Sequence, residues 1–244
     1  MYHKIIIALG GMLLAFSACS DNHDVTSIPR EIYGSGDLVS ETRQLPGFNS
    51  LVVNTVIDIA VTRGASQEVV VTSDDNIIEY IRTPVYNGVL YIYLQDGVSI
   101  SDFSMELDLT VTDLEAVVIN SVATVEGSGN FDVDDLFFEM NSVGNIYLDI
   151  NANEVYSINN SSGNIVLSGF AYRHNAAVSS VGYIQAFELE TDTTYVVANS
   201  VGNAYVKANV YLHATISSIG SIYYRGYPEI HLEDNGTGRL INAN

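Results

Sequence analysis

The sequence is poor in cysteine, tryptophan and proline: its 244 residues include one Cys, no Trp and four Pro. A single cysteine excludes an internal disulfide framework and zinc sites built from cysteine pairs. Basic residues are also scarce, with 9 Lys and Arg against 29 Asp and Glu, which gives a net charge of −20 at pH 7. Because phosphate binding requires positive charge, nucleic acid is excluded as a partner, and close contact with anionic lipid headgroups is disfavoured.

Motifs of common enzymes are missing as well. The chain has no Gly-rich phosphate loop, no Cys-x-x-Cys pair and no nucleophile elbow. Its acidic groups, Asp74-Asp75, Asp134-Asp135 and the region 102–108, lack the oxygen-ligand spacing of calcium loops, so we interpret them as solvated turns. We therefore predict that the protein is not an enzyme and carries no cofactor.

Two histidines of the repeats are further candidates for metal binding. His213 and His231 are 18 residues apart and could stack on successive turns of a repeat, as a metal-binding pair does. No carboxylate has an evident place beside them, and two imidazoles alone are more typical of surface residues. We therefore expect no metal site.

The N-terminus carries an export signal. Lys4 precedes an apolar run of twelve residues, 5–16, which has the length of a signal-peptide core and is too short to span a bilayer. The run ends in Phe16-Ser-Ala-Cys19, which resembles a bacterial lipobox. An ordinary signal peptide with an incidental cysteine is the alternative. Lipidation explains both the position of Cys19 and the absence of any other cysteine.

These features predict three segments: a lipoprotein signal peptide over 1–18, a lipidated Cys19 with a polar tether over 19–39, and a single domain over 40–244. The tether begins Ser20-Asp-Asn-His-Asp24, whose acidic residues resemble the signal that exports lipoproteins of Bacteroidetes to the outer face of the outer membrane. A tether without any signal is the alternative. We expect an outer-membrane, lipid-anchored protein at the cell surface or, failing that, on the periplasmic face.

A short phrase recurs every 18 to 20 residues between 141 and 240, for example Asn141-Ser-Val-Gly-Asn-Ile146 and Asn199-Ser-Val-Gly-Asn-Ala204, and a degenerate copy over 120–125 precedes it. Residues around each phrase alternate in steps of two, with Ile146, Leu148 and Ile150 on one side and Tyr147 and Asp149 on the other. This is strand periodicity. Repeats this short cannot each close a core and must stack. The pattern predicts an all-β fold, a β-solenoid of about 19 residues per coil.

One position of the repeat is nearly always glycine. Its occupants are Ala123, Gly144, Gly163, Gly182, Gly202, Gly220 and Gly238. Glycine is expected where neighbouring backbones approach closely. The serine two positions earlier, present in six of the seven copies, is interpreted as structural, because a serine nucleophile would need a histidine base that the motif does not supply.

The half before the repeats predicts strands over 51–61, 67–72, 89–94 and 103–112, with a short capped helix over 74–81 that has Asp74 or Asp75 as N-cap. Asn87-Gly88 predicts a hairpin turn. We expect this irregular N-terminal half to form irregular coils or a cap over one end of the solenoid.

The order of these motifs resembles one known family. Leu45-Pro-Gly-Phe-Asn-Ser-Leu-Val-Val, Asn87-Gly-Val-Leu-Tyr-Ile92, Asp113-Leu-Glu-Ala-Val-Val-Ile119 and the Ser-x-Gly-x-Ile repeats are similar to the head-GIN-domain family of auto-transporter adhesins of Bacteroidetes-type bacteria. The resemblance covers roughly residues 42 to 242. It implies a right-handed parallel β-helix, often on a lipoprotein, and no known enzymatic activity.

The outward residues of the repeats form a candidate binding strip. Stacking the coils predicts ladders of β-branched, amide and phenol side chains, whose members are Val143, Asn145, Tyr147, Asn164, Tyr183, Asn203, Tyr205 and Tyr223. Such ladders also stabilise a sheet by themselves, and this alternative stays open. As a binding surface, the strip suits a glycan or an extracellular protein.

Two functions follow from the sequence. The first is a cell-surface lipoprotein that acts as a binding module, an adhesin. The alternative is a periplasmic protein with a structural or envelope-homeostasis role that acts through protein–protein packing. Unpaired strand edges at the coil ends also make self-association possible.

Overall fold

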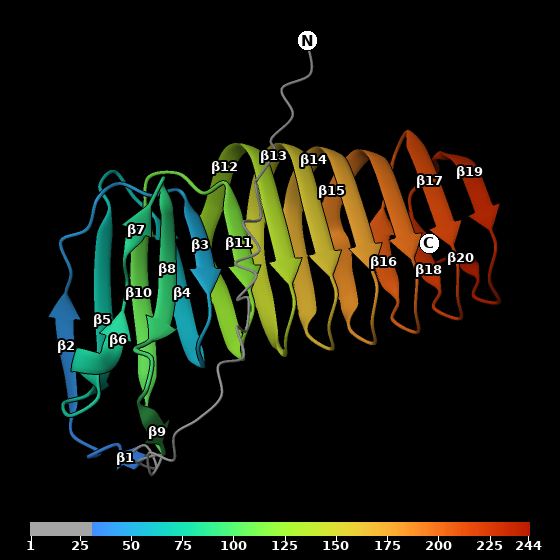
Figure 1. The fold of residues 1–244 in the computed structure, drawn as a ribbon. Coiled ribbons are helices and arrows are strands. Elements are labelled where there is room, and N and C mark those ends of the chain that lie inside the picture. Colours follow the sequence, from blue (N-terminus) through green and yellow to red (C-terminus); the bar gives the residue numbers. More distant parts are fainter. Residues whose placement is uncertain (1–30) are drawn as a thin grey trace.

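The computed structural model describes residues 31–244, and the predicted signal peptide, Cys19 and the first part of the predicted tether lie outside this range. The described chain is a β-solenoid of about 7 turns with ~19 residues per coil, as predicted (Figure 1). Within residues 31–244, no helix is long and apolar enough to cross a membrane.

The solenoid has two walls, which the long strands β12 to β15 join into one sheet. Wall A contains, in spatial order, β2 (Leu38–Thr42), β5 (Glu68–Asp74), β10 (Met105–Val111), β4 (Ile57–Arg63), the first parts of β12 (Ala123–Met140), β13 (Gly144–Asn159), β14 (Asn164–Val178) and β15 (Tyr183–Ala198), then β16 (Ala204–Lys207), β18 (Ile222–Arg225) and β20 (Leu240–Asn242).

Wall B contains β7 (Val85–Tyr86), β8 (Val89–Leu94), β3 (Ser50–Val53), β11 (Ala116–Ile119), the second parts of β12 to β15, β17 (Tyr211–Ile216) and β19 (Glu229–Asp234). β6 (Ile81–Arg82) pairs with the end of β8, and β1 (Glu31–Tyr33) pairs with β9 (Ser99–Ser101) in a separate two-stranded sheet. β1 and the start of β2 lie before residue 40, so strand structure begins within the segment predicted to be a tether.

The predicted alternation sets the core. In wall A the residues two and four positions after each glycine slot from Gly144 to Gly220 point inward, and Ile150 follows six positions after Gly144, so Ile146, Leu148 and Ile150 are buried while Tyr147 and Asp149 are exposed. The sixth position after Gly182 is the exposed Glu188, because the register shifts there. In the register of the strands Ile146 stacks between Val125 and Ile165, and this inner column continues through the later coils. Stacked aliphatic side chains of successive coils thus form one continuous core.

Chain order and spatial order differ in the N-terminal half. β3 lies between β8 and β11 in wall B, and β4 lies between β10 and β12 in wall A. The coil of β3 and β4, which comes first in the sequence, therefore lies between two coils that come later in the sequence. The N-terminal half thus contributes coils to both walls, with the antiparallel strands β5 and β2 at the outer edge of wall A and β7 at that of wall B.

The predicted capped helix over 74–81 is wrong. Only a single 3-10 turn, Ile78–Tyr80, forms there, and no side chain caps it. The Asp74 carboxylate is buried and instead accepts hydrogen bonds from the backbone N–H groups of Gly36 (2.6 Å) and Ser104 (2.9 Å). The Asn87-Gly88 turn is confirmed, because both residues have positive φ and join the antiparallel strands β7 and β8.

Candidate functional site

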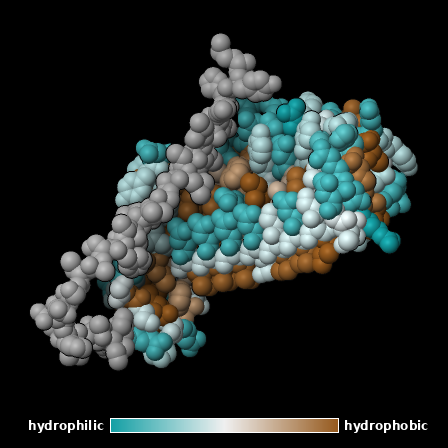
Figure 2. All heavy atoms as spheres, turned by 45° about the vertical axis from the view of Figure 1, so that its right-hand side comes forward, coloured by the Kyte–Doolittle hydropathy of each residue, from teal (hydrophilic) through white to brown (hydrophobic). Residues whose placement is uncertain are grey.

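The predicted strip lies on the outer face of wall A, where its three columns run across neighbouring coils. The first column is at the turns that lead into wall A, and its exposed aliphatic members are Val56, Val122, Val143, Val181, Val201 and Ile219; we call it the turn row. Figure 2 shows the hydrophobic side chains of these turns as a row along one edge of the solenoid. Each is 42% to 61% exposed.

The second column consists of amide, phenol and hydroxyl groups. Asn145, Asn164, Tyr183, Asn203 and Ser221 occupy equivalent positions on successive coils, with Asn203 and Ser221 directly before β16 and β18. The amide of Asn164 donates a hydrogen bond to Oδ1 of Asn145 over 2.9 Å. Oδ1 of Asn203 accepts the backbone N–H of Ser221 over 2.8 Å. The asparagines of the strip therefore use some of their hydrogen-bonding groups to connect neighbouring coils.

The third column is aromatic only at its ends. Tyr147 is followed by Val166 and Gln185 before Tyr205 and Tyr223 are reached, so the three predicted tyrosines do not form one stack. Tyr205 and Tyr223 do stack, with ring centroids 4.8 Å apart and planes 15° apart. Tyr147 is 39% exposed and has no aromatic register partner on the neighbouring strands.

An aromatic cluster that the sequence analysis missed enlarges the C-terminal end of the strip. The Phe187 ring lies 5.5 Å from that of Tyr205, the Tyr183 ring lies 6.3 Å from it, and the Arg225 guanidinium lies 4.3 Å from the Phe187 centroid. Phe187 faces outward by the same alternation as Tyr183 and Gln185, and it lies at the register shift between β14 and β15. The sequence indicates this bulge by the interval of 20 rather than 19 residues between Gly182 and Gly202, since a bulge adds one residue to a strand.

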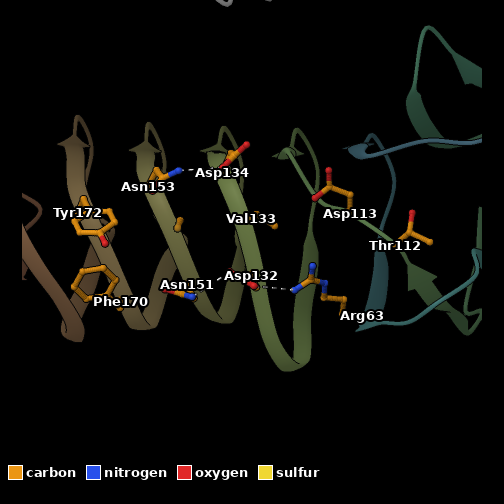
Figure 3. Close-up of a pocket in the computed structure, with 11 residues that line it drawn as sticks. Arg63, Thr112, Asp113, Asp132, Val133, Asp134, Asn151, Asn153, Phe170 and Tyr172 are labelled. Atoms are coloured by element: carbon orange, nitrogen blue, oxygen red, sulfur yellow. Dashed lines mark hydrogen bonds and ion pairs between the residues drawn. The ribbon is translucent and has the colours of Figure 1, made fainter.

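A groove lies at the opposite edge of the solenoid, where wall A strands bend into wall B strands. It has a volume of about 560 Å³. At one end Arg63 Nη1 lies 4.0 Å from a carboxylate oxygen of Asp132, and at the other end the rings of Phe170 and Tyr172 meet edge to face, 4.9 Å apart (Figure 3). Between them the amide of Asn151 donates to Asp132 over 3.0 Å. The repeated phrase does not predict this groove, because the groove residues come from the bends between the walls.

The structure also places a serine beside a histidine. Oγ of Ser157 lies 2.6 Å from Nε2 of His174, but both side chains are fully buried in the core. A nucleophile that no substrate can reach cannot act on one. The serines of the repeated phrase contribute through their backbone: the carbonyl oxygens of Ser161, Ser180 and Ser200 accept the N–H groups of the next coil's glycines.

Comparisons with known proteins agree with this fold. Residues 47–228 match the family model "Putative auto-transporter adhesin, head GIN domain". A crystal structure of a "putative adhesin" from Bacteroides fragilis is similar at 24% identity and a TM-score of 0.83, covering 86% of this chain and 99% of that one. No curated protein matches the chain.

Two further crystal structures are similar. A "putative adhesin" from Parabacteroides merdae has 20% identity and a TM-score of 0.71, covering 88% of this chain and 99% of that one. A "putative lipid binding protein" from Parabacteroides distasonis has 22% identity and a TM-score of 0.70, covering 88% of this chain and 100% of that one. At these identities the likenesses show a shared fold.

Proposed function

The chain belongs to the head GIN domain family, and from this premise we propose that it is a lipid-anchored binding module of the outer cell surface that contacts its ligand through the strip on wall A. The binding role, the lipid anchor at Cys19 and the surface location go beyond family membership. Catalysis has no part in this proposal.

The lack of charge on the strip is the observation that supports binding there. From β13 to β18 its three columns hold only aliphatic, amide, hydroxyl and phenol groups, although the net charge of the chain is −20. The strip measures roughly 19 by 13 Å from the spacing of strands and of alternate residues. A ligand can displace water from such a surface without stripping the hydration of a charged group.

The chemistry of the strip favours a neutral glycan. Tyrosine rings offer flat apolar faces with a polar tip, and the rings of Tyr183, Phe187, Tyr205 and Tyr223 adjoin one another at one end. Asn164 uses one amide N–H within the sheet and has a second for a ligand, whereas Asn145 and Asn203 use their Oδ1 atoms there rather than their N–H groups. An extracellular protein segment is the other ligand that these groups suit.

A structural role in the periplasm is the alternative, and one observation favours it. Stacked rings and amide hydrogen bonds use several strip residues within the sheet itself, which is how cross-strand pairs stabilise a sheet. Protease treatment of intact cells separates the two locations. Cleavage of this protein while a periplasmic control survives is expected, and protection until the outer membrane is broken would contradict a role at the cell surface.

The strip is tested by replacing Tyr147, Tyr205 and Tyr223 together with serine. We expect a folded protein with lost binding to a glycan array or to immobilised matrix protein. The matched control replaces Tyr156, Tyr195 and Tyr211 of wall B with serine. These too are one separate tyrosine, Tyr156, and one adjoining pair, Tyr195 and Tyr211, whose ring centroids are 6.1 Å apart. The control is expected to bind normally.

The groove provides a further comparison. Tyr172 is 57% exposed and lines the groove, so Tyr172→Ser reports on that surface alone. Loss of binding in Tyr172→Ser with normal binding in the strip variant would move the binding site from wall A to the groove. A large drop in thermal stability with intact binding in the strip variant would assign the tyrosines a purely structural role.

A further inference from the structure

Three metal-ligating side chains meet on the outer face of wall B, on the two strands β17 and β19 (Figure 1). His213 and His231 are direct register partners on these parallel strands, and their ring centroids are 4.7 Å apart. Glu233 follows His231 by two residues and therefore points to the same face of the sheet. The structure thus supplies the carboxylate that the sequence analysis did not place beside the histidines.

The distances between the ligand atoms suit one small metal ion. Oε1 of Glu233 lies 3.4 Å from Nε2 of His213 and 3.7 Å from Nε2 of His231, and the ligand atoms of the three residues all lie within 4.8 Å of one another. Zinc binds imidazole nitrogen and carboxylate oxygen at about 2.0–2.2 Å, so tetrahedral ligands stand about 3.4 Å apart. Only small side-chain movements would bring the three groups onto one ion.

The position of the three residues permits an ion to enter. The side chains of His213, His231 and Glu233 are 28%, 55% and 49% exposed. An ion pair between exposed groups contributes little stability by itself. A metal ion held by the same groups would connect β17 to β19, a strand whose six side chains are all exposed.

We propose that His213, His231 and Glu233 form a zinc-binding site that ties β19 to β17, with water in the fourth position. Imidazole nitrogen suits Zn²⁺, whereas Ca²⁺ and Mg²⁺ require oxygen ligands. The site has the composition of zinc centres with two histidines and one carboxylate, which keep a position open to solvent. It is independent of the binding strip on wall A.

Calorimetric titration of the purified full chain with ZnCl₂ tests the site. We expect His231→Gln and Glu233→Gln each to weaken zinc binding at this site at least tenfold. The matched control is Glu229→Gln, an exposed carboxylate on the same strand outside the cluster, which is expected to leave the affinity within twofold. His3, Cys19 and His23 are common to all variants, so any zinc that they hold cancels in the comparison.

A second measurement keeps folding separate from binding. Far-UV circular dichroism without zinc is expected to be the same for all variants, because the replaced side chains are at the surface. Zinc should raise the melting temperature of the unmodified chain and of Glu229→Gln, but not of Glu233→Gln. Equal zinc affinity in all four proteins, or a folded unmodified chain that binds no zinc, would overturn the proposal.

Discussion

The hydroxyl oxygen of Ser157 lies 2.6 Å from Nε2 of His174, and both side chains are fully buried in the core behind wall B. Among residues 31–244, Nδ1 of His174 is the one buried side-chain nitrogen or oxygen atom without a hydrogen-bond partner. Burial lowers the pKa of His174 from 6.5 to about 4, because a charged imidazole would lose its hydration. The folded protein therefore keeps this histidine neutral at physiological pH.

Acidification should destabilise the fold through His174. The unfolded chain binds a proton at His174 once the pH falls below 6.5, whereas the folded chain does so only near pH 4. Stability is thus fully present above pH 6.5 and is lost between 6.5 and 4, by about 3 kcal/mol from this residue. Urea denaturation at several pH values measures the loss.

The control for that series is the double variant His174→Leu with Ser157→Ala, which removes both hydrogen-bonding partners and leaves no unsatisfied hydroxyl. Its free energy of unfolding should fall less over the same pH range, by the amount assigned to His174. The same pH dependence in both proteins would show that His174 does not titrate as described.

Gly202→Ala should destabilise the solenoid by about 2 kcal/mol, because a Cβ there would overlap the carbonyl oxygen of Gly182 and lie 2.6 Å from that of Ser180. Gly47→Ala is the control, since a Cβ at Gly47 meets no atom within 4 Å; it should change stability by less than about 0.5 kcal/mol. Thermal or urea denaturation compares the two. Similar effects of both variants would argue against close backbone approach as the reason for the glycine repeat.

Asp74→Ala should weaken the N-terminal half by about 2 kcal/mol. The carboxylate accepts the N–H groups of Ser104 and Gly36, and these hydrogen bonds hold the pKa of Asp74 below its ordinary value. Because the folded pKa is lowered, this contribution is present above the unfolded pKa and is lost as the pH falls through the folded one. Asp75→Ala, at an exposed carboxylate that accepts only from the Ser35 hydroxyl, should cost much less. Hydrogen exchange of the Gly36 and Ser104 amides would locate the effect.

Asn141→Ala should cost about 1 kcal/mol, since Asn141 links two coils. Its amide donates to Asn120 over 3.0 Å, and its Oδ1 accepts from Asn160 over 2.9 Å. Asn199 has the same place in its own repeat, but Ser179 and Ser217 stand at the neighbouring positions. Asn199→Ala should therefore be nearly neutral, and an equal loss of stability in the two variants would count against the asparagine ladder.

Local pattern and distant contact account for different parts of this protein. The alternation around Ile146 and the interval between Gly163 and Gly182 already predict strands, inward faces and stacked coils, because side-chain direction in a strand depends only on residue parity. The strip residues were placed on one face by the same rule. The misassigned segment at Asp74 followed local helix signals, and the tertiary hydrogen bonds to Gly36 and Ser104 replaced them.

The sequence by itself determined the all-β solenoid, its coil length and the family, since each depends on a pattern repeated along the chain. Only the tertiary structure decided that β3 and β4 are enclosed by later coils, that Phe187 joins the aromatic rings of Tyr205 and Tyr223, and that Glu233 stands beside His213. Those arrangements depend on register between strands distant in the chain. A single bulge or insertion shifts that register, and no local residue pattern specifies the result.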